Sequence, residues 1–401
     1  MDPTPTIEHD LRTILGIQAL RAFGYGFASV VLGAALVDSG LSDAQVGLVF
    51  AAILAGNAVV SIAVGLAGDR LGRRRTYAIL LATLAVAGVA YAFSSRLIVL
   101  IPVALTGTLS TDANESGPLT SLEQAMMGGA APDIRVRVFG RYNAVAYLAG
   151  AAGALLGGGP ALLRDRLPNL PSDQHWLLLL SLVAIGCVAL TRRLSPEIDA
   201  PRERSGRPLS RSRTEVTRLA ALFGLDAFAG GFVVSTFLVF WFGRRVGASA
   251  ELMGLVLFGS GLLQAGSSIA SGRIAGRFGL LRTMVFTHLP SNVLLILVPV
   301  MPTLGLGIAM LLARSTLSQM DVPARQAYVT ALVDPDERTA AAAFTNTARY
   351  VVRPFGAATA GALMQSVAIG APFVVAGTLK SVYDVVLYAR FRTVRLPEEP
   401  G

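Results

Sequence analysis

The chain has 401 residues, of which 53% are hydrophobic and 15% are charged, and its formal net charge is +9. Because soluble domains carry roughly 25% charged residues, this composition excludes an ordinary soluble protein. A single cysteine excludes an intrachain disulfide, and three scattered histidines offer no metal-ligand spacing, so we predict no metal and no cofactor.

Long apolar blocks follow one another along the chain. Each is long enough to cross a bilayer, which takes about 20 helical residues. We therefore predict an all-α membrane protein whose connections are too short for a soluble domain. The twelve predicted spans are 12–37, 43–66, 76–94, 97–127, 139–157, 174–191, 219–242, 251–271, 283–300, 303–330, 342–365 and 370–390.

Basic residues are distributed unequally between the connections. With the N-terminus placed inside, the inside segments hold 23 basic residues and the outside segments hold five. This asymmetry follows the positive-inside rule, so we expect both termini in the cytoplasm. The sequence pI near 10.3 therefore reflects topology and anionic lipid, and we predict no nucleic-acid partner. The acidic first ten residues lack the basic region of a cleavable signal.

The first span contains Arg21, in the stretch LRAFGYGF at 20–27. A charge at the centre of a bilayer costs about 2.5–3.5 kcal/mol on an insertion scale, so such a residue usually has a partner or a function. The same stretch recurs at 225–232 as LDAFAGGF, where Asp226 takes the place of Arg21. The two charges therefore occupy equivalent positions in an internal repeat.

Two further matches extend the repeat. A shift of 207 places 65–76 on 272–283, and a shift of 203 places 132–158 on 335–361. Three matches in order, at nearly one offset, indicate that the chain consists of two related halves. We predict an N-terminal six-helix bundle at 1–191, an arginine-rich cytoplasmic linker at 192–218 and a C-terminal six-helix bundle at 219–401.

The stretch GLAGDRLGRRR, residues 65–75, resembles the signature loop G-x-x-x-D-R-x-G-R-R-[KR] of the major facilitator superfamily. The resemblance covers essentially the whole chain, and a poorly characterised bacterial branch is expected. It implies two bundles around a central cavity that transport by alternating access, and no enzyme activity. The stretch GALLGG at 153–158 is similar to a drug:proton antiporter motif without its proline, but Val103 stands about where many drug antiporters have an arginine.

By this resemblance the signature loop is a cytoplasmic gate. Asp69 is expected to engage the cytoplasmic start of the span 342–365, because the partial positive charge of a helix N-terminus favours a carboxylate. The loop glycines are expected to permit close approach of helices, and the loop arginines also set topology. The predicted gate residues are Gly65, Asp69, Arg70, Gly72, Arg73 and Arg135.

Helices 1, 4, 7 and 10 line the cavity in this superfamily, and most intramembrane charges of this chain fall on them. We predict that Arg21 and Asp226 pair between the two halves, either as a pair that forms and breaks or as a static packing pair. Asp112 and Glu115 share a helix face, which favours a proton shared between them; alternatively, 110–118 is a helix break. The predicted cavity residues are Arg21, Asp112, Glu115, Asp226, Arg314, Asp321, Arg325, Arg349 and Arg353.

Arginines are concentrated in the last third of the chain. Arg349 and Arg353 are four residues apart on one helix face, and a guanidinium suits a carboxylate or phosphate. This pattern favours an anionic or zwitterionic substrate. The alternative is that three acids, Asp321, Glu123 and Glu115, neutralise the arginines.

In the last span we predict a local ion pair between Lys380 and Asp384. For the whole chain, the prediction is a monomeric secondary transporter in the inner membrane that exports a small molecule in exchange for protons. Two alternatives stay open: a proton-coupled importer of an organic anion, and a ligand sensor that does not transport. The lipid bilayer, the proton and an unidentified small molecule are the expected partners.

Overall fold

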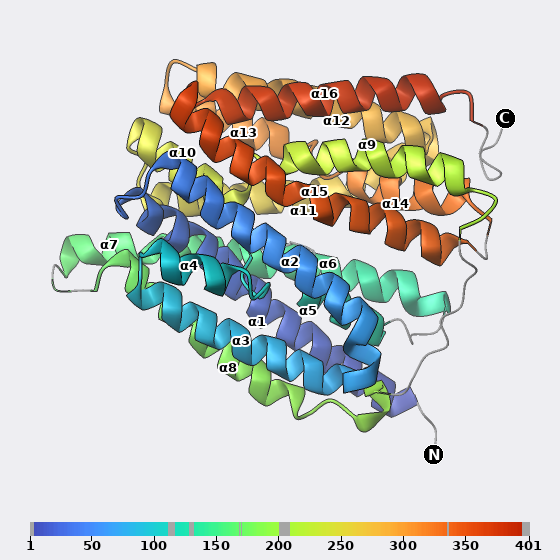
Figure 1. The fold of residues 1–401 in the computed structure, drawn as a ribbon, viewed down its shortest axis with the longest axis horizontal. Helices are drawn as coiled ribbons and strands as arrows, with labels where there is room; N and C mark the ends of the chain where they lie inside the picture. The colour runs from blue at the N-terminus through green and yellow to red at the C-terminus, as the bar shows by residue number, and fades with distance from the viewer. Residues whose placement is uncertain are drawn as a thin grey trace. The chain divides into compact units, whose positions relative to one another are not determined.

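The computed structural model describes residues 4–110, 117–127, 132–167, 169, 171–199, 209–334 and 337–394, and Figure 1 shows their fold. The described secondary structure consists of α-helices and three short 3-10 helices, without a strand. Eight helices of this described part are long and apolar enough to cross a membrane. The prediction of an all-α membrane protein is therefore confirmed.

Nine of the twelve predicted spans correspond to one main helix each. The span 174–191 begins with a short 3-10 helix, η1 (Asp173–Leu177), and the span 283–300 ends with another, η3 (Val298–Val300). The main helices are α1 (Thr4–Val37), α2 (Asp43–Leu71), α3 (Arg73–Phe93), α6 (Pro132–Gly157), α8 (Leu178–Thr191), α11 (Ala250–Phe278), α12 (Leu280–Leu297), α15 (Arg338–Ser366) and α16 (Ala371–Phe391).

The other three predicted spans are not continuous helices. The reason lies partly in proline, which has no backbone donor and cannot continue a helix from the preceding turn. Pro118 begins the second piece of 97–127, and Pro323 lies in the first turn of the second piece of 303–330. The paired pieces are α4 (Leu97–Ala104) with α5 (Pro118–Met127), α9 (Arg213–Gly231) with α10 (Ser235–Val246), and α13 (Leu304–Ser315) with α14 (Asp321–Leu332).

The chain divides into two compact units. The first unit holds residues 1–202 and 234–259, and the second holds 203–233 and 260–401. In the first unit α1 packs along α6 and α3 packs along α8, while in the second α9 packs along α15 and α12 along α16. The predicted halves differ from these units in residues 234–259, which group with the first unit. Short helices α7 (Gly159–Arg166) and η2 (Pro196–Asp199) complete the described part.

Equivalent glycines bring equivalent helices close together in the two units. A Cβ atom on Gly153 of α6 would lie 2.0 Å from the carbonyl oxygen of Phe23 on α1. A Cβ on Gly356 of α15 would lie 1.9 Å from the carbonyl oxygen of Phe228 on α9. Both contacts exclude a side chain, so each unit depends on a small residue at the same position of the repeat.

Candidate functional site

A buried carboxylate, Glu123 of α5, is the centre of a polar cluster in the first unit. Its side chain is fully buried, and Arg21 of α1 donates to both of its oxygens, at 2.6 Å and 3.3 Å. Tyr77 of α3 and Tyr142 of α6 donate their hydroxyl protons to the same carboxylate. Four hydrogen bonds therefore hold the Glu123 side chain in place between helices α1, α3, α5 and α6.

Arg21 is thus neutralised within its own unit. It also donates to Gln18, one turn earlier on α1, and its guanidinium lies 5.3 Å from the ring centroid of Tyr25. Glu123 supplies the countercharge of Arg21 in this structure, and the expected pair between Arg21 and Asp226 stays a prediction. Glu123 therefore pairs with an arginine of the first span, and not with one of the arginines in the last third of the chain that the alternative assigned to it.

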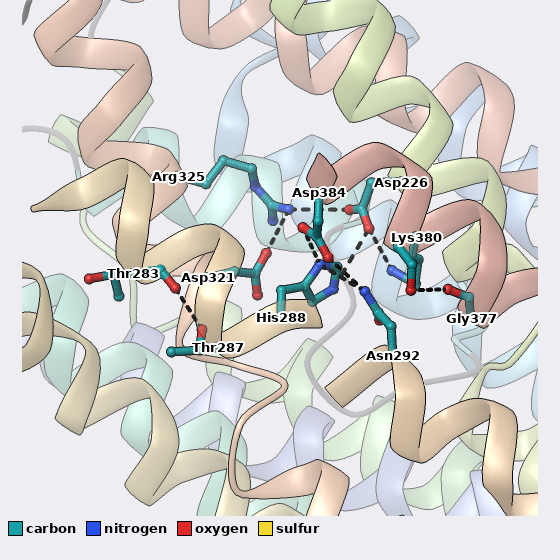
Figure 2. A network of polar contacts seen from close by, with 11 residues as sticks. Asp226, Thr283, Thr287, His288, Asn292, Asp321, Arg325, Gly377, Lys380 and Asp384 are labelled. Atoms are coloured by element: carbon teal, nitrogen blue, oxygen red, sulfur yellow. Dashed lines mark hydrogen bonds and ion pairs between the residues drawn. The ribbon is translucent and has the colours of Figure 1, made fainter. Parts of the chain in front are cut away.

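Asp226 of α9 is the centre of a second cluster, shown in Figure 2. Lys380 of α16 donates to Asp226 Oδ1 at 2.6 Å, and Arg325 of α14 donates to Asp226 Oδ2 at 3.3 Å. Arg325 also donates to Asp321, four residues earlier on α14, at 3.1 Å. All four side chains are at least nine-tenths buried, so two cations and two anions compensate one another away from water.

The second cluster continues through His288 of α12. Its Nδ1 lies 3.0 Å from Asp384 Oδ1, and its Nε2 lies 3.9 Å from Asp226 Oδ1. Asn292, one turn later on α12, donates to Asp384 Oδ2 at 2.8 Å. A histidine therefore stands between two buried carboxylates, as Figure 2 shows.

These contacts correct the prediction for the last span. Lys380 and Asp384 are one turn apart on α16, but they do not pair with each other. Lys380 binds Asp226, and Asp384 binds His288 and Asn292. Helix packing explains the difference, because α16 lies against both α9 and α12 and each side chain meets a partner on a different neighbour.

Arg349 and Arg353 lie one turn apart on α15, as the sequence predicts, and both are partly buried. The Nε atom of Arg349 is buried, and no described residue accepts its hydrogen bond. Arg314 lies in the last turn of α13. The structure therefore places one guanidinium with unused hydrogen-bonding capacity in the unit that holds the Asp226 cluster.

Several predicted residues lie outside the described part of the chain. These include Asp112 and Glu115. The neighbouring helices are α4, which ends at Ala104, and α5, which begins at Pro118. Residues 105–110 and residue 117 are not helical, but residues 111–116 lie outside the described part, so the alternative of a helix break at 110–118 stays a prediction. The side chains of Asp69, Arg70 and Arg135 also lie outside the described set, so the expected contact of Asp69 with the start of α15 stays a prediction.

Gly72 of the predicted gate acts differently from the prediction. Gly72 ends α2 and precedes α3 with φ +82°, and its repeat equivalent Gly279 precedes α12 with φ +84°. A side chain would strain this left-handed backbone, so Gly72 is needed for the turn and not for helix approach. A Cβ on Gly65 would meet no described atom within 4 Å, and its role in close approach stays a prediction.

Two carboxylates, Asp199 and Glu337, form hydrogen bonds at the two ends of the predicted linker, residues 192–218. Asp199 accepts a hydrogen bond from the backbone nitrogen of Arg74, at the start of α3, at 2.8 Å. Glu337, which precedes α15, accepts from the backbone nitrogens of Ser210, Arg211 and Ser212 at 2.8–3.1 Å. These backbone hydrogen bonds, led by that of Ser210, lower the pKa of Glu337 to about 2.

Sequence reasoning named the central carboxylates, Glu123 and Asp226, but missed several of the side chains around them. His288 lies inside a predicted span, and an ionisable residue there is by itself a signal of function. The tyrosines at 77 and 142 carry no such signal, because tyrosine is common in apolar helices. Asn292 follows His288 by one helical turn, and this spacing was the available sign that the two share a face.

Known proteins share the sequence pattern and the fold of this chain. The family model described as Major Facilitator Superfamily matches residues 14–356. A yeast protein, the uncharacterized membrane protein YJR124C of Saccharomyces cerevisiae, is 24% identical in an alignment 420 positions long that covers 95% of this chain and 94% of the yeast protein.

Solved transporter structures share the fold at low identity. The nucleoside transporter NupG has a TM-score of 0.73 and 14% identity, over 95% of this chain and 99% of that one. A bacterial homologue of the human lysosomal transporter Spinster, inward-facing and occupied, has a TM-score of 0.74 and 16% identity, over 97% of each chain. The human organic anion transporter MFSD10 has a TM-score of 0.63 and 16% identity, over 95% and 99%.

Proposed function

The chain belongs to the Major Facilitator Superfamily, and we propose that it is a secondary transporter that couples the movement of a small molecule to the movement of protons. The family makes it a multi-pass membrane transporter and not an enzyme. Proton coupling is our proposal, and one observation carries it: the buried cluster of Asp226, Lys380, Arg325 and His288.

A structural role alone explains this cluster poorly. Charged side chains in membrane-spanning helices are costly, and they are concentrated where ions or substrates pass. A pair that only joined helices would need two charges, whereas this cluster connects four helices and includes an imidazole, which changes its charge near neutral pH. The arrangement suits a transporter whose charge pairs exchange partners as a proton arrives.

We propose export as the direction, in agreement with the partial antiporter motif at 153–158. The bilayer is proposed to be a bacterial inner membrane, with both termini cytoplasmic and the monomer as the working unit. Asp112 and Glu115 stay candidates for a second proton site, and Asp69, Arg70 and Arg135 stay candidates for the gate. A sensor that does not transport is the remaining alternative, and the experiment below separates it from a carrier.

The experiment is proton movement driven by a solute gradient. Purified protein is reconstituted into liposomes that contain a pH-sensitive dye, and nucleosides, organic anions and lipophilic cations are added outside in turn. A proton-coupled transporter changes the internal pH with at least one solute class, and a protonophore abolishes the change. If solute enters the liposomes while the pH stays constant, coupling is refuted; if no solute enters at all, the sensor is supported.

A second candidate, import of an organic anion, is favoured by the buried Nε of Arg349. A guanidinium binds a carboxylate or phosphate through two parallel hydrogen bonds, and Arg349 has a donor available for one of them. MFSD10, which shares the fold, is an organic anion transporter. In a thermal-shift assay, stabilisation by organic anions that is lost in Arg349→Ala but kept in Arg218→Ala supports this candidate. Stabilisation by lipophilic cations alone would count against it.

A further inference from the structure

The buried carboxylates of the two clusters differ in the kind of partner that balances their charge. An arginine stays protonated at every physiological pH, so a carboxylate that it neutralises has little tendency to take up a proton. Lysine acts in the same way while it remains paired. Three carboxylates have such partners: Glu123 has Arg21, Asp321 has Arg325, and Asp226 has Arg325 and Lys380.

Asp384 is the exception among these buried acids. It is fully buried, and its hydrogen-bond partners in the described part of the chain are His288 and Asn292. Asn292 is neutral, so the imidazole is the group that balances the carboxylate. A histidine facing an aspartate can bear one proton or two, which an arginine facing a glutamate cannot.

We propose that His288 and Asp384 together form the proton-binding site of this transporter, and that Asp226 detects the bound proton through the second ring nitrogen of His288. This inference rests on the proposed proton coupling for its role in transport. The binding of the proton itself is a property of the purified protein and is tested separately.

The geometry gives each ring nitrogen its own carboxylate. With one proton on the pair, that proton lies between His288 Nδ1 and Asp384 Oδ1, which are 3.0 Å apart. A second proton, taken from water, binds to Nε2, whose nearest carboxylate oxygen is Asp226 Oδ1 at 3.9 Å. The ring then carries a positive charge between two anions. Release returns the same proton to water, and no other bond forms or breaks.

The second proton changes the balance at Asp226. Its Oδ1 already accepts a hydrogen bond from Lys380 Nζ at 2.6 Å. An imidazolium beside the same oxygen adds a second cation, and two cations on one oxygen weaken each other's hold because like charges repel strongly away from water. Protonation of His288 therefore loosens the Lys380–Asp226 pair, which joins α16 to α9.

Other groups around the ring act on the same equilibrium. Tyr383 of α16 contacts His288 edge to face, at 6.1 Å between ring centroids. Helices α13 and η3 also pack near α12, but no charged side chain from them contacts the ring within the described residues. The buried charged side chains of the helices packed against α12 are Asp321 and Arg325 on α14 and Lys380 and Asp384 on α16, and Asp226 on α9 faces the second ring nitrogen.

The test follows the protonation of His288 by NMR. The chain has three histidines, so the variant His9→Gln/His175→Gln retains His288 as its single imidazole. Protein labelled with ¹³C at histidine Cε1 is titrated over roughly pH 5–9 in detergent, without any solute. We expect the resonance to shift with the uptake of one proton. A resonance that keeps one position over this range would overturn the proposal.

Two variants test the role of the neighbours. Asp384→Asn removes the balancing anion, so the titration midpoint is expected to move to lower pH by about one unit or more. Thr287→Val, which removes a hydrogen bond from the Thr287 hydroxyl to the backbone carbonyl of Thr283 one turn earlier on α12, is expected to leave the midpoint unchanged. Equal midpoints in the parent and in Asp384→Asn would refute the paired site. If Asp384→Asn does not fold, the titration of the parent decides alone.

The dye-filled liposomes separate this inference from the proposed function. If the parent moves protons with a solute and His288→Asn moves them equally well, proton coupling stands and the assignment to His288 is refuted. If the parent moves a solute without protons, the proposed coupling fails whatever the NMR titration shows. Loss of proton movement in His288→Asn, with solute binding retained, is the result that we expect.

Discussion

Glu123 and Asp384 are both buried acids, and the difference between their partners assigns them different roles. Arg21 and two tyrosines donate four hydrogen bonds to Glu123, so this carboxylate fixes helices in place. Asp384 faces an imidazole and an amide, which leaves its charge balance adjustable. One acid is therefore a structural anchor, and the other is suited to proton transfer.

Removal of the anchor has a large expected cost. Glu123→Gln leaves Arg21 buried without a countercharge, and breaking a buried pair costs about 3–5 kcal/mol. Glu215→Gln is the matched control, because Glu215 pairs with Arg218 on the surface, where such pairs contribute at most about 1 kcal/mol. Thermal unfolding in detergent compares the two. Equal losses of stability would contradict the anchoring role of Glu123.

Acid stability reports on Glu337. Its pKa is lowered from 4.5 to about 2 in the folded protein, so its contribution to stability is complete above pH 4.5 and disappears as the pH falls to about 2. Glu337→Gln is expected to remove this part of the acid sensitivity, and the measurement is unfolding as a function of pH. An identical pH profile in the variant and the parent would show that the hydrogen bonds from Ser210–Ser212 do not form.

The same residues show the limits of sequence reasoning. Arg21 and Asp226 stand out, because charge inside an apolar span is unusual and the repeat aligns the two. Their partners do not follow from spacing. Glu123 is 102 residues from Arg21 in the sequence, and Lys380 reaches Asp226 because α16 packs against α9. Ion-pair partners that lie on distant segments of the chain can be identified only when the packing of the helices is known.

At the scale of elements, apolar length predicts where helices lie but not where they break. Residues 97–127, 219–242 and 303–330 each read as one long apolar block, yet each forms two helices. Gly117 and Pro118 were a visible warning for the first of these, and Pro323 was one for the third. The break after Gly231 has no proline, so its position depends on packing.

Close helix contacts give a direct prediction at this scale. Gly356→Ala places a methyl group against the carbonyl of Phe228, where the space between α15 and α9 is too small, and such overpacking costs about 1–3 kcal/mol. Gly266→Ala in α11, where no described atom lies within 4 Å, is expected to be neutral or stabilising. The thermal midpoints of the two variants provide the comparison. A Gly356→Ala variant as stable as Gly266→Ala would contradict the close approach.

At the scale of the whole molecule, the repeat is visible in both sequence and structure. Each unit has a pair of helices in close contact through a glycine, and each has a helix that begins after a left-handed glycine, at Gly72 and Gly279. Each also has a buried charge cluster to which one of the equivalent helices α1 and α9 contributes a charge, Arg21 in the first unit and Asp226 in the second. Two units of similar design are what transport by alternating access requires.

The signature loop supplies a prediction about the resting state. If Asp69 stabilises closure on the cytoplasmic side, Asp69→Asn shifts the population toward the inward-facing state. Labelling of single cysteines that line the cytoplasmic side, in a Cys187→Ala background, measures this shift, with Asp38→Asn in the loop between α1 and α2 as the control. Equal labelling rates in Asp69→Asn and the parent would refute the gating role.

The measurement that tests the central claim most directly is solute accumulation driven by an imposed pH gradient. Liposomes containing the parent protein are given a gradient of either sign, with the solute at equal concentration on both sides. The account predicts that the solute accumulates against its own gradient, that the sign of the pH gradient sets the direction, and that a protonophore abolishes the effect. Solute that only equilibrates, whatever the pH gradient, would contradict proton-coupled transport.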